Sequence, residues 1–219
     1  MSDALIALED VDFSYGPERP VLSGCNLRLE PGQRIGLIGA NGSGKTTLLQ
    51  LVVGLVRPSG GRLEAFGRVR SRETDFREVR RRAGLLFQDA DDQLFCPTVA
   101  EDVAFGPLNL GKRGGEVRQI VARTLDSLGL AGYEERITYK LSGGEKRLVA
   151  LAAVLAMQPD VLLLDEPVAG LDEEVEGRVT EILAGLPQAM LIVSHDRRFL
   201  ERVATRMLRL AGGRLQGAD

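Results

Sequence analysis

A glycine-rich segment, residues 39–46, constrains the fold of this 219-residue chain more than any other feature. It reads Gly-Ala-Asn-Gly-Ser-Gly-Lys-Thr and matches the phosphate-binding P-loop pattern G-x-x-x-x-G-K-[ST]. The run 34–38 before it predicts a short buried strand, and the run 47–53 after it predicts a helix that ends near Gly54. A strand, a glycine loop and a helix N-terminus together allow backbone N–H groups to surround a triphosphate. The segment therefore predicts a nucleotide-binding α/β domain.

Each residue type in the P-loop has a chemical use. Lys45 is expected to reach the outer phosphates, and the Thr46 hydroxyl is expected to bind Mg²⁺. The alternative is a glycine-rich turn without function, which the complete match in its expected context disfavours. The residues predicted to contact the nucleotide in this region are Gly39, Ala40, Asn41, Gly42, Ser43, Gly44, Lys45, Thr46 and Thr47.

Composition limits what else the chain can do. A net charge of −3 gives no reason to expect affinity for nucleic acid. The cluster Arg80-Arg81-Arg82 is expected on a solvated helix face. No apolar run is long enough to span a bilayer, so any work at a membrane requires another subunit to supply the spanning helices.

Strands and helices alternate along the rest of the chain. Further strands are predicted at 5–15, 21–30, 62–66, 85–87, 161–164, 190–193 and 206–210, and further helices at 173–183 and 198–203. From Thr98 to about Met157 the pattern is mainly helical. One helix there follows Gly114-Gly115 and is closed by Gly129, and a second runs over 146–157. The order predicts an α/β fold with a parallel sheet and an inserted helical region.

Residues that could contact a ligand follow directly on four of the predicted buried strands. They are Gly39, which starts the P-loop, Gln88, Asp165-Glu166 and Ser194-His195. Ligands of open α/β sheets bind beyond the carboxyl ends of the strands, so these groups are expected at one edge. Asp165 is expected to hold Mg²⁺ opposite Thr46, and Gln88 to reach the metal or the attacking water.

Two of these residues are predicted to be catalytic. Glu166 is expected to orient or deprotonate the attacking water, and His195 to bind the γ-phosphate and keep Glu166 and the water in line. The competing readings are a strand-terminal acid that caps a turn and a histidine that is merely a satisfied polar residue. The position of both residues at strand ends in a P-loop chain favours the catalytic interpretation.

The segment Leu141-Ser142-Gly143-Gly144-Glu145 allows two interpretations. Ser142 and Glu145 have the spacing of a capping box, which is simply how a helix begins. Ser142, Gly143 and Gly144 also expose N–H groups at a positive helix end, which makes an anion site. The segment lies far from the P-loop in sequence. One nucleotide is therefore expected to touch both only if two chains face each other.

Together these residues resemble the ATPase subunit of an ABC transporter. Residues 39–46 match Walker A, Gln88 the Q-loop, 141–145 the LSGGE signature, 161–166 Walker B with the catalytic glutamate, and 170–172 the D-loop, while His195 matches the switch histidine. The resemblance implies a P-loop NTPase (RecA-like) core at about 1–88 and 158–219. It also implies an N-terminal antiparallel β subdomain and an α-helical subdomain at about 89–157, all within one ABC ATPase domain.

The same resemblance implies hydrolysis of ATP with Mg²⁺ in a nucleotide-sandwich dimer, a homodimer or a heterodimer with a paralogous ATPase. Tyr15 would stack on adenine, and Asp172 would contact the partner's P-loop. The implied catalytic residues are Glu166, His195 and Lys45; the implied metal ligands are Thr46, Gln88 and Asp165; and the implied contacts across the dimer are Ser142, Gly143, Gly144 and Asp172.

A narrower resemblance covers residues 91–110, which are similar to energy-coupling-factor importers for cobalt or nickel and less closely to those for vitamins such as biotin. It implies a groove near Gln88–Leu110 for integral membrane subunits, and a location on the cytoplasmic face of the membrane. Ordinary core packing is the alternative for this segment. Asp89-Ala90 and Val168-Ala169 depart from the commoner family residues.

Two other classes of function are weighed against an importer motor. A soluble ABC ATPase of ribosomes or DNA repair would usually need a second nucleotide domain or a long coiled coil. A P-loop kinase or GTPase would leave 141–145 and His195 without a role. The sequence does not identify the transported solute or the partner chains.

Overall fold

The computed structural model describes residues 4–17 and 19–218, which form two compact units. The first unit contains the residues up to 85, those from 160 to 166 and those from 187 onward. The second contains residues 86–159 and 167–186. The predicted helical subdomain, 89–157, falls in the second unit, which also takes in 167–186.

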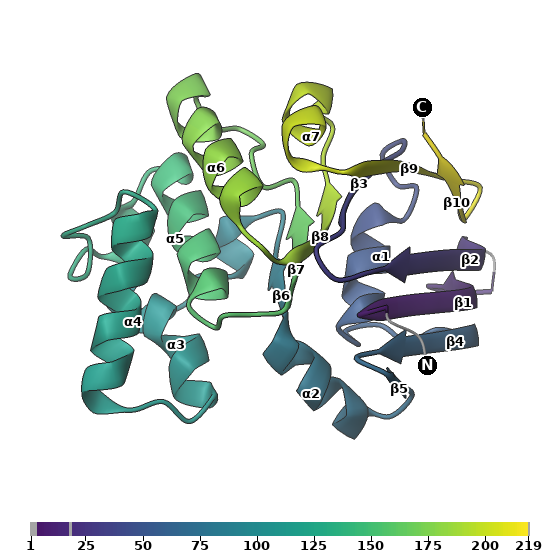
Figure 1. Ribbon diagram of the computed structural model, residues 1–219, viewed down its shortest axis with the longest axis horizontal. Coiled ribbons are helices and arrows are strands. Elements are labelled where there is room, and N and C mark those ends of the chain that lie inside the picture. The colour runs from purple at the N-terminus through teal and green to yellow at the C-terminus, as the bar shows by residue number, and fades with distance from the viewer. Residues whose placement is uncertain (1–3, 18, 219) are drawn as a thin grey trace. The chain divides into compact units, whose positions relative to one another are not determined.

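Four strands of the first unit form an antiparallel sheet (Figure 1). Its order is β2-β1-β4-β5, with bounds Pro20–Leu29, Ile6–Ser14, Gly60–Ala65 and Arg68–Val69. Alternate side chains such as Ile6, Leu8 and Val11 are buried, as expected for a sheet with one covered face. The predicted strands at 5–15, 21–30 and 62–66 agree with these bounds to within two residues.

A second, six-stranded sheet has the order β10-β9-β3-β8-β7-β6. The strands β9 (Arg206–Ala211), β3 (Arg34–Ile38), β8 (Ala189–Val193) and β7 (Val161–Asp165) are parallel to one another. β7 and β8 are buried over their whole length, which is why each reads as an unbroken apolar run. β6 spans Ala83–Leu86, and the edge strand β10, Arg214–Gly217, is antiparallel to β9.

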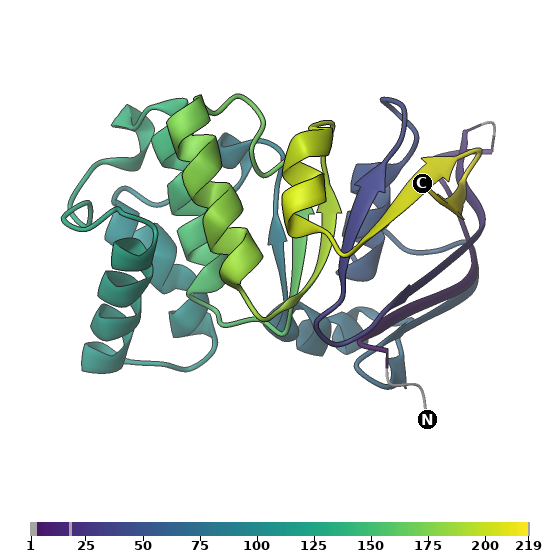
Figure 2. The ribbon, with the colours of Figure 1, turned by 45° about the horizontal axis from the view of Figure 1, so that its top comes forward.

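Helix α1, Lys45–Val52, lies between the two sheets of the first unit (Figures 1 and 2). Leu48, Leu49, Leu51 and Val52 are fully buried there and join side chains of both sheets in one hydrophobic core. Burial of such side chains contributes roughly 1.5–3 kcal/mol each. This packing fixes the start of α1 directly after the P-loop.

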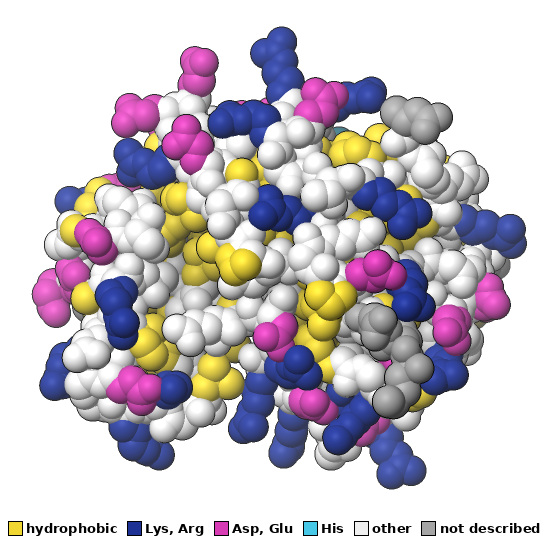
Figure 3. Space-filling view, in the orientation of Figure 1, with side chains coloured by type: hydrophobic (Ala, Val, Ile, Leu, Met, Phe, Trp, Pro, Cys, Tyr) yellow, Lys and Arg dark blue, Asp and Glu magenta, His cyan; other side chains and the backbone are white. Residues whose placement is uncertain are grey.

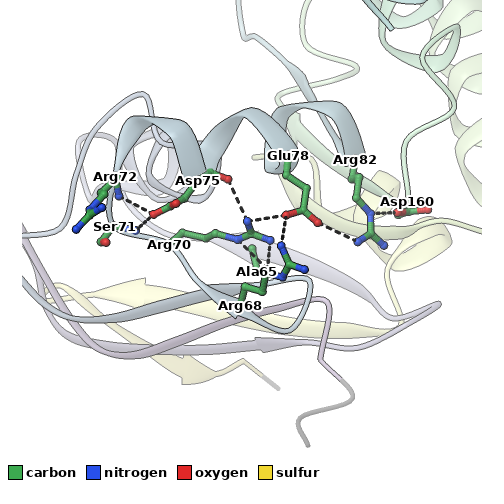
Figure 4. A network of polar contacts seen from close by, with 9 residues as sticks. All are labelled: Ala65, Arg68, Arg70, Ser71, Arg72, Asp75, Glu78, Arg82 and Asp160. Carbon is green, nitrogen blue, oxygen red and sulfur yellow. Dashed lines mark hydrogen bonds and ion pairs between the residues drawn. The ribbon is translucent and has the colours of Figure 1, made fainter.

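Helix α2, Glu73–Arg82, is joined to β4, β5 and β7 by a network of polar contacts around the buried Arg70 (Figure 4). The Arg70 guanidinium donates to Ala65 O at 2.8 Å and to Glu78 Oε2 at 2.8 Å. The Arg70 hydrogen bond lowers the pKa of the Glu78 carboxyl. At the far end of α2, Arg82 Nε donates to Asp160 Oδ2 at 2.6 Å, just before β7. The network ties α2 to the strand that carries Asp165.

The second unit is helical (Figure 1). Its helices are α3 (Val99–Asn109), α4 (Gly114–Ser127), α5 (Gly143–Leu155) and α6 (Glu173–Gly185), with the short 3₁₀ helices Ala90–Asp92 and Thr138–Lys140. α5 packs on both α3 and α4. Its residues from Arg147 to Ala152 are buried on every side, so it is the central helix of the unit.

Several elements differ from the prediction. α5 begins at Gly143 rather than 146, because Ser142 caps it, and α4 begins at Gly114 itself. The helix α2 and the strands β5 and β10 were not predicted, and the short helix α7 starts at Arg197 and ends at Val203. α2 was not predicted because only two of its ten residues, Phe76 and Val79, are buried. Arg80-Arg81-Arg82 do belong to a helix, its last turn.

Charged side chains of both signs are spread over the face drawn in Figure 3. Lys and Arg side chains project at its lower edge, where Figure 1 draws α2. In the described part of the chain, no helix has the length and apolar character needed to cross a membrane.

Candidate active site

The P-loop joins β3 to α1 in a conformation that depends on its glycines. Gly44 has a φ of 103°, and a Cβ there would lie 2.5 Å from Val21 Cγ1. A Cβ on Gly39 would lie 2.6 Å from Leu210 O. Both positions therefore require glycine, one for its backbone angle and both for close packing. The loop is shaped as the motif predicts.

Lys45 is the first residue of α1 and is 7% exposed. Its Nζ donates to Gly39 O at 2.9 Å and to Ala40 O at 3.1 Å, so its ammonium group lies against the loop. Ser43 Oγ is buried, and no described residue forms a hydrogen bond with it. A buried hydroxyl and an ammonium group at a helix N-terminus suit the oxygens of a phosphate chain.

Tyr15 follows β1 and is exposed. Its hydroxyl lies 3.1 Å from Thr47 Oγ1 on α1, and its ring meets Phe13 edge to face. The ring is thus held beside the first turn of the P-loop helix, with much of its surface open to solvent.

The carboxyl ends of β7 and β8 bring the predicted acids and the histidine together. Asp165 is the last residue of β7 and is buried. Glu166 follows it at a φ of 51°, and its N–H donates to Val193 O at 2.9 Å. His195 Nε2 lies 3.4 Å from Glu166 Oε1. Three adjacent strands, β3, β8 and β7, therefore end in the P-loop, the histidine and the two acids.

The donor set fits a hard divalent cation. The Thr46 hydroxyl and the Asp165 carboxylate offer oxygen ligands, which Mg²⁺ prefers. Thr46 is exposed on the first turn of α1, whereas Asp165 is 3% exposed. Two protein oxygens leave other positions for phosphate oxygens and water, as is usual for magnesium bound with a nucleotide.

Gln88 lies in the second unit, where its backbone is fastened to α5. Arg147, which is 6% exposed, donates to Phe87 O at 2.6 Å and also to Gln88 O. Gln93 Nε2 donates to Ala150 O at 3.1 Å and so ties the same loop to α5 again. The Gln88 side chain is exposed. The sequence did not predict this role of Arg147. The one feature that could have indicated it is a charged residue next to the apolar residues of the signature helix.

The signature segment forms the capped start of α5. Ser142 Oγ accepts a hydrogen bond from Glu145 N at 3.3 Å, and Ser142 N donates to Glu145 Oε2 at 2.8 Å. The predicted capping box is therefore present. Tyr133 OH also donates to Glu145 Oε1 at 2.8 Å. The Ser142 N–H and then the Tyr133 hydroxyl lower the pKa of Glu145.

Ser142 and Gly144 border a cavity within the second unit that also meets the D-loop residues. Its volume is about 260 Å³, and its lining includes Gly170, Asp172 and Arg178. Asp172 Oδ1 caps α6 by accepting from Val175 N at 2.9 Å. The structure thus brings together, in one unit, Ser142, Gly144 and Asp172, which were predicted to meet a partner chain.

The segment after Gln88 exposes aromatic side chains. Phe95 is 66% exposed and packs edge to face against Phe105, with ring centroids 4.8 Å apart. The buried Asp102 holds this segment by accepting hydrogen bonds from Phe95 N at 3.1 Å and Cys96 N at 3.0 Å. Leu108 is also half exposed. We call these three side chains, Phe95, Phe105 and Leu108, the apolar patch.

Comparison with known proteins gives consistent matches. A family model described as "ABC transporter" matches residues 22–169. The energy-coupling factor transporter ATP-binding protein EcfA of Methanothermobacter thermautotrophicus is 42% identical over 215 residues, covering 96% of this chain and 69% of that protein.

Two solved structures are similar over nearly the whole chain. CbiO1 from Clostridium perfringens, described as part of the ABC transporter complex cbiONQ, has a TM-score of 0.87 and 32% identity, covering 98% of this chain and 87% of that one. The ATP-binding cassette MJ0796, a dimer in a post-hydrolysis state bound to ADP and Pi, has a TM-score of 0.86 and 25% identity, covering 96% of each chain.

Proposed function

The chain belongs to the ABC transporter family of ATPases, and from this premise we propose that it is the motor subunit of an energy-coupling-factor importer. In this proposal two ATPase chains close around ATP and Mg²⁺ and reopen after hydrolysis. The single observation that carries the proposed ATP hydrolysis is the convergence of the P-loop, Asp165, Glu166 and His195 at the ends of three adjacent parallel strands.

The first unit supplies the proposed nucleotide cradle. Residues 39–47 surround the phosphates with N–H groups, Lys45 neutralises their charge, and Tyr15 stacks on the adenine. Thr46 and Asp165 hold Mg²⁺, which shields the phosphate charge when bound, and Gln88 of the second unit stays a predicted third ligand. The buried Ser43 hydroxyl and the Lys45 ammonium at the start of α1 support this assignment.

Glu166 is the proposed general base. It takes a proton from the attacking water as the water oxygen bonds to the γ-phosphorus. The bond between the γ-phosphorus and the β–γ bridging oxygen breaks, and its electron pair stays on ADP. Glu166 then gives the proton to the released phosphate. His195 orients the γ-phosphate and the water. The burial of Glu166 and its 3.4 Å approach to His195 support these roles.

The second unit supplies the proposed contacts to the partner's nucleotide: Ser142, Gly143, Gly144 and Asp172. Ser142 and Gly143 are exposed at the N-terminus of α5, where the helix dipole favours an anion. In the structure Ser142 caps its own helix; contact with a γ-phosphate would use its remaining hydrogen-bonding capacity. The dimeric, ADP- and Pi-bound MJ0796 structure supports an assembly of this kind.

The importer assignment concerns the apolar patch and the groove that the resemblance predicts near Gln88–Leu110. Exposed aromatic side chains on a segment held by Asp102 suit a helix of an integral membrane subunit. Similarity to EcfA and CbiO1 supports this partner class, and with it a location on the cytoplasmic face of the membrane. We propose a cobalt or nickel ion as the transported solute, with a vitamin such as biotin as the alternative.

The test is the substitution Glu166→Gln, which removes the base but keeps the shape of the side chain. We expect it to bind Mg-ATP and to lower kcat at least roughly a hundredfold, because a positioned base contributes about 10²–10⁴-fold. Turnover and equilibrium nucleotide binding are measured on the same preparation. A variant that hydrolyses ATP at nearly the parent rate would remove Glu166 from this role.

A further inference from the structure

Glu166 is held in a backbone conformation that its own side chain does not favour. Its φ of 51° lies in the left-handed region, which is strained for a residue other than glycine. The hydrogen bond from its N–H to Val193 O, at 2.9 Å, helps to keep it there. Glu166 is 7% exposed, so its carboxylate direction is set by neighbouring protein groups rather than by bulk water.

The two oxygens of this carboxylate have different surroundings. Oε2 accepts hydrogen bonds from Ser194 Oγ at 3.3 Å and from His195 N at 3.2 Å. Oε1 is buried, and none of the described residues donates a hydrogen bond to it. His195 Nε2 lies 3.4 Å from Oε1, within ion-pair range but outside hydrogen-bond geometry. One oxygen is therefore anchored, and the other retains its accepting capacity.

Ser194 can hold Glu166 only as a hydrogen-bond donor. It is 2% exposed, so water does not compete for its hydroxyl. Asp196 N donates to Ser194 Oγ at 3.1 Å and occupies a lone pair of that oxygen. A carboxylate oxygen can only accept, so the single proton of the Ser194 hydroxyl is donated to Glu166 Oε2. Ser194 thereby connects the turn before α7 to the acid that follows β7.

We infer that Ser194 is a positioning residue, which holds the Glu166 carboxylate by Oε2 and so fixes the orientation in which Glu166 acts as the base. This inference rests on the proposed role of Glu166 as the base. An anchored Oε2 fixes the rotation of the carboxylate, and a base that is fixed in advance requires no reorganisation when the water reacts. Ser194 itself contacts neither the water nor the phosphate.

The test compares Ser194→Ala with Ser194→Thr, which keeps the hydroxyl. We expect Ser194→Ala to lower kcat roughly tenfold to a hundredfold, the range for one hydrogen bond to a charged group, while KM and the Kd for Mg-ATP stay unchanged. Ser194→Thr is expected to recover most of kcat. Thr180→Val is the matched control, because it removes an equally buried hydroxyl that donates to Glu176 O on α6. Its kcat should equal that of the wild type.

A second measurement covers the case in which the threonine methyl group does not fit. In the Glu166→Gln background there is no carboxylate left to orient, so adding Ser194→Ala should leave the single-turnover rate unchanged. A further fall equal to that seen in the wild-type background would overturn the inference, as would a wild-type kcat in Ser194→Ala or a loss confined to KM. Rapid turnover by Glu166→Gln alone would instead overturn the proposed function itself.

Discussion

Tyr15 has an exposed ring whose orientation is fixed at two points. Phe13 meets the ring edge to face with centroids 4.9 Å apart, and Thr47 Oγ1 lies 3.1 Å from its hydroxyl. The residue is nevertheless 59% exposed. An aromatic ring that is already ordered loses little side-chain entropy when a base stacks on it. At the scale of the residue, Tyr15 therefore presents an ordered and exposed ring, which suits its proposed stacking on adenine.

We predict that Tyr15→Ala raises the Kd for ATP about fivefold to a hundredfold, since stacking on a base contributes roughly 1–3 kcal/mol. The Kd for inorganic tripolyphosphate, which has no base, should not change. Tyr15→Phe keeps the ring and serves as the control. Isothermal titration with both ligands makes the comparison, and an equal loss for ATP and tripolyphosphate would show that Tyr15 acts on the P-loop instead.

Sequence reasoning at this scale identified residue types but not the roles of single atoms. Glu166 and His195 could be predicted because both follow apolar runs that β7 and β8 bury completely. The distinction between Oε1 and Oε2 could not, because it depends on the rotation of two side chains and on the positive φ of Glu166. Ser194 was seen only as the neighbour of His195, and a serine at a strand end has no specific signal.

The carboxylate of Glu145 stabilises the N-terminus of helix α5. Glu145 accepts from Ser142 N and Tyr133 OH, and Arg136 Nη1 lies 3.0 Å from its Oε1. These donors favour the ionised form, so the pKa of Glu145 lies below its ordinary value of 4.5. The hydrogen bond between the Tyr133 hydroxyl and Glu145 also raises the pKa of that hydroxyl. The start of the signature helix thus depends on a negative charge.

The pH dependence follows from the sign of this shift. A carboxylate whose pKa is lowered by folding stabilises the native state above its unfolded pKa and loses that effect as the pH falls through the folded value. We predict that Glu145→Gln lowers the free energy of unfolding at pH 7 by about 1 kcal/mol and reduces its dependence on pH below 4.5.

Urea unfolding at several acidic pH values, followed by circular dichroism, measures both quantities. Asp75 and Glu78, whose pKa values are also lowered, are present in both proteins, so the difference reports Glu145 alone. Parallel pH profiles for the variant and the wild type would contradict the prediction.

Elements differed in how well the sequence predicted them, for a physical reason. β7 and β8 were placed to within one residue because strands covered on both faces consist of nearly continuous apolar runs. α2 is held instead by Arg70 and by Arg82, through contacts with residues distant in sequence such as Asp160. Its sequence contains only two apolar residues, Phe76 and Val79, among ten. β10 is an edge strand whose Arg214 bonds to Ser23 O, a contact that only the folded chain reveals.

At the scale of the whole molecule, the two units carry different parts of the proposed ATP site. The first contains the P-loop, Asp165, Glu166 and His195, and the second contains Ser142, Gly144 and Asp172 around one cavity. In the proposed assembly, the second set acts on the nucleotide bound by the partner chain. Hydrolysis should then depend on the concentration of the protein, whereas binding of ATP to one chain should not.

The most direct test is the mass of the Glu166→Gln variant in solution, measured by light scattering with and without Mg-ATP. The account predicts a rise from the monomer mass of 23.7 kDa to twice that value when Mg-ATP is added. Adding Ser142→Arg should keep the protein monomeric while ATP still binds. A wild-type monomer that binds ATP and hydrolyses it at the full rate at high dilution would contradict a site shared between two chains.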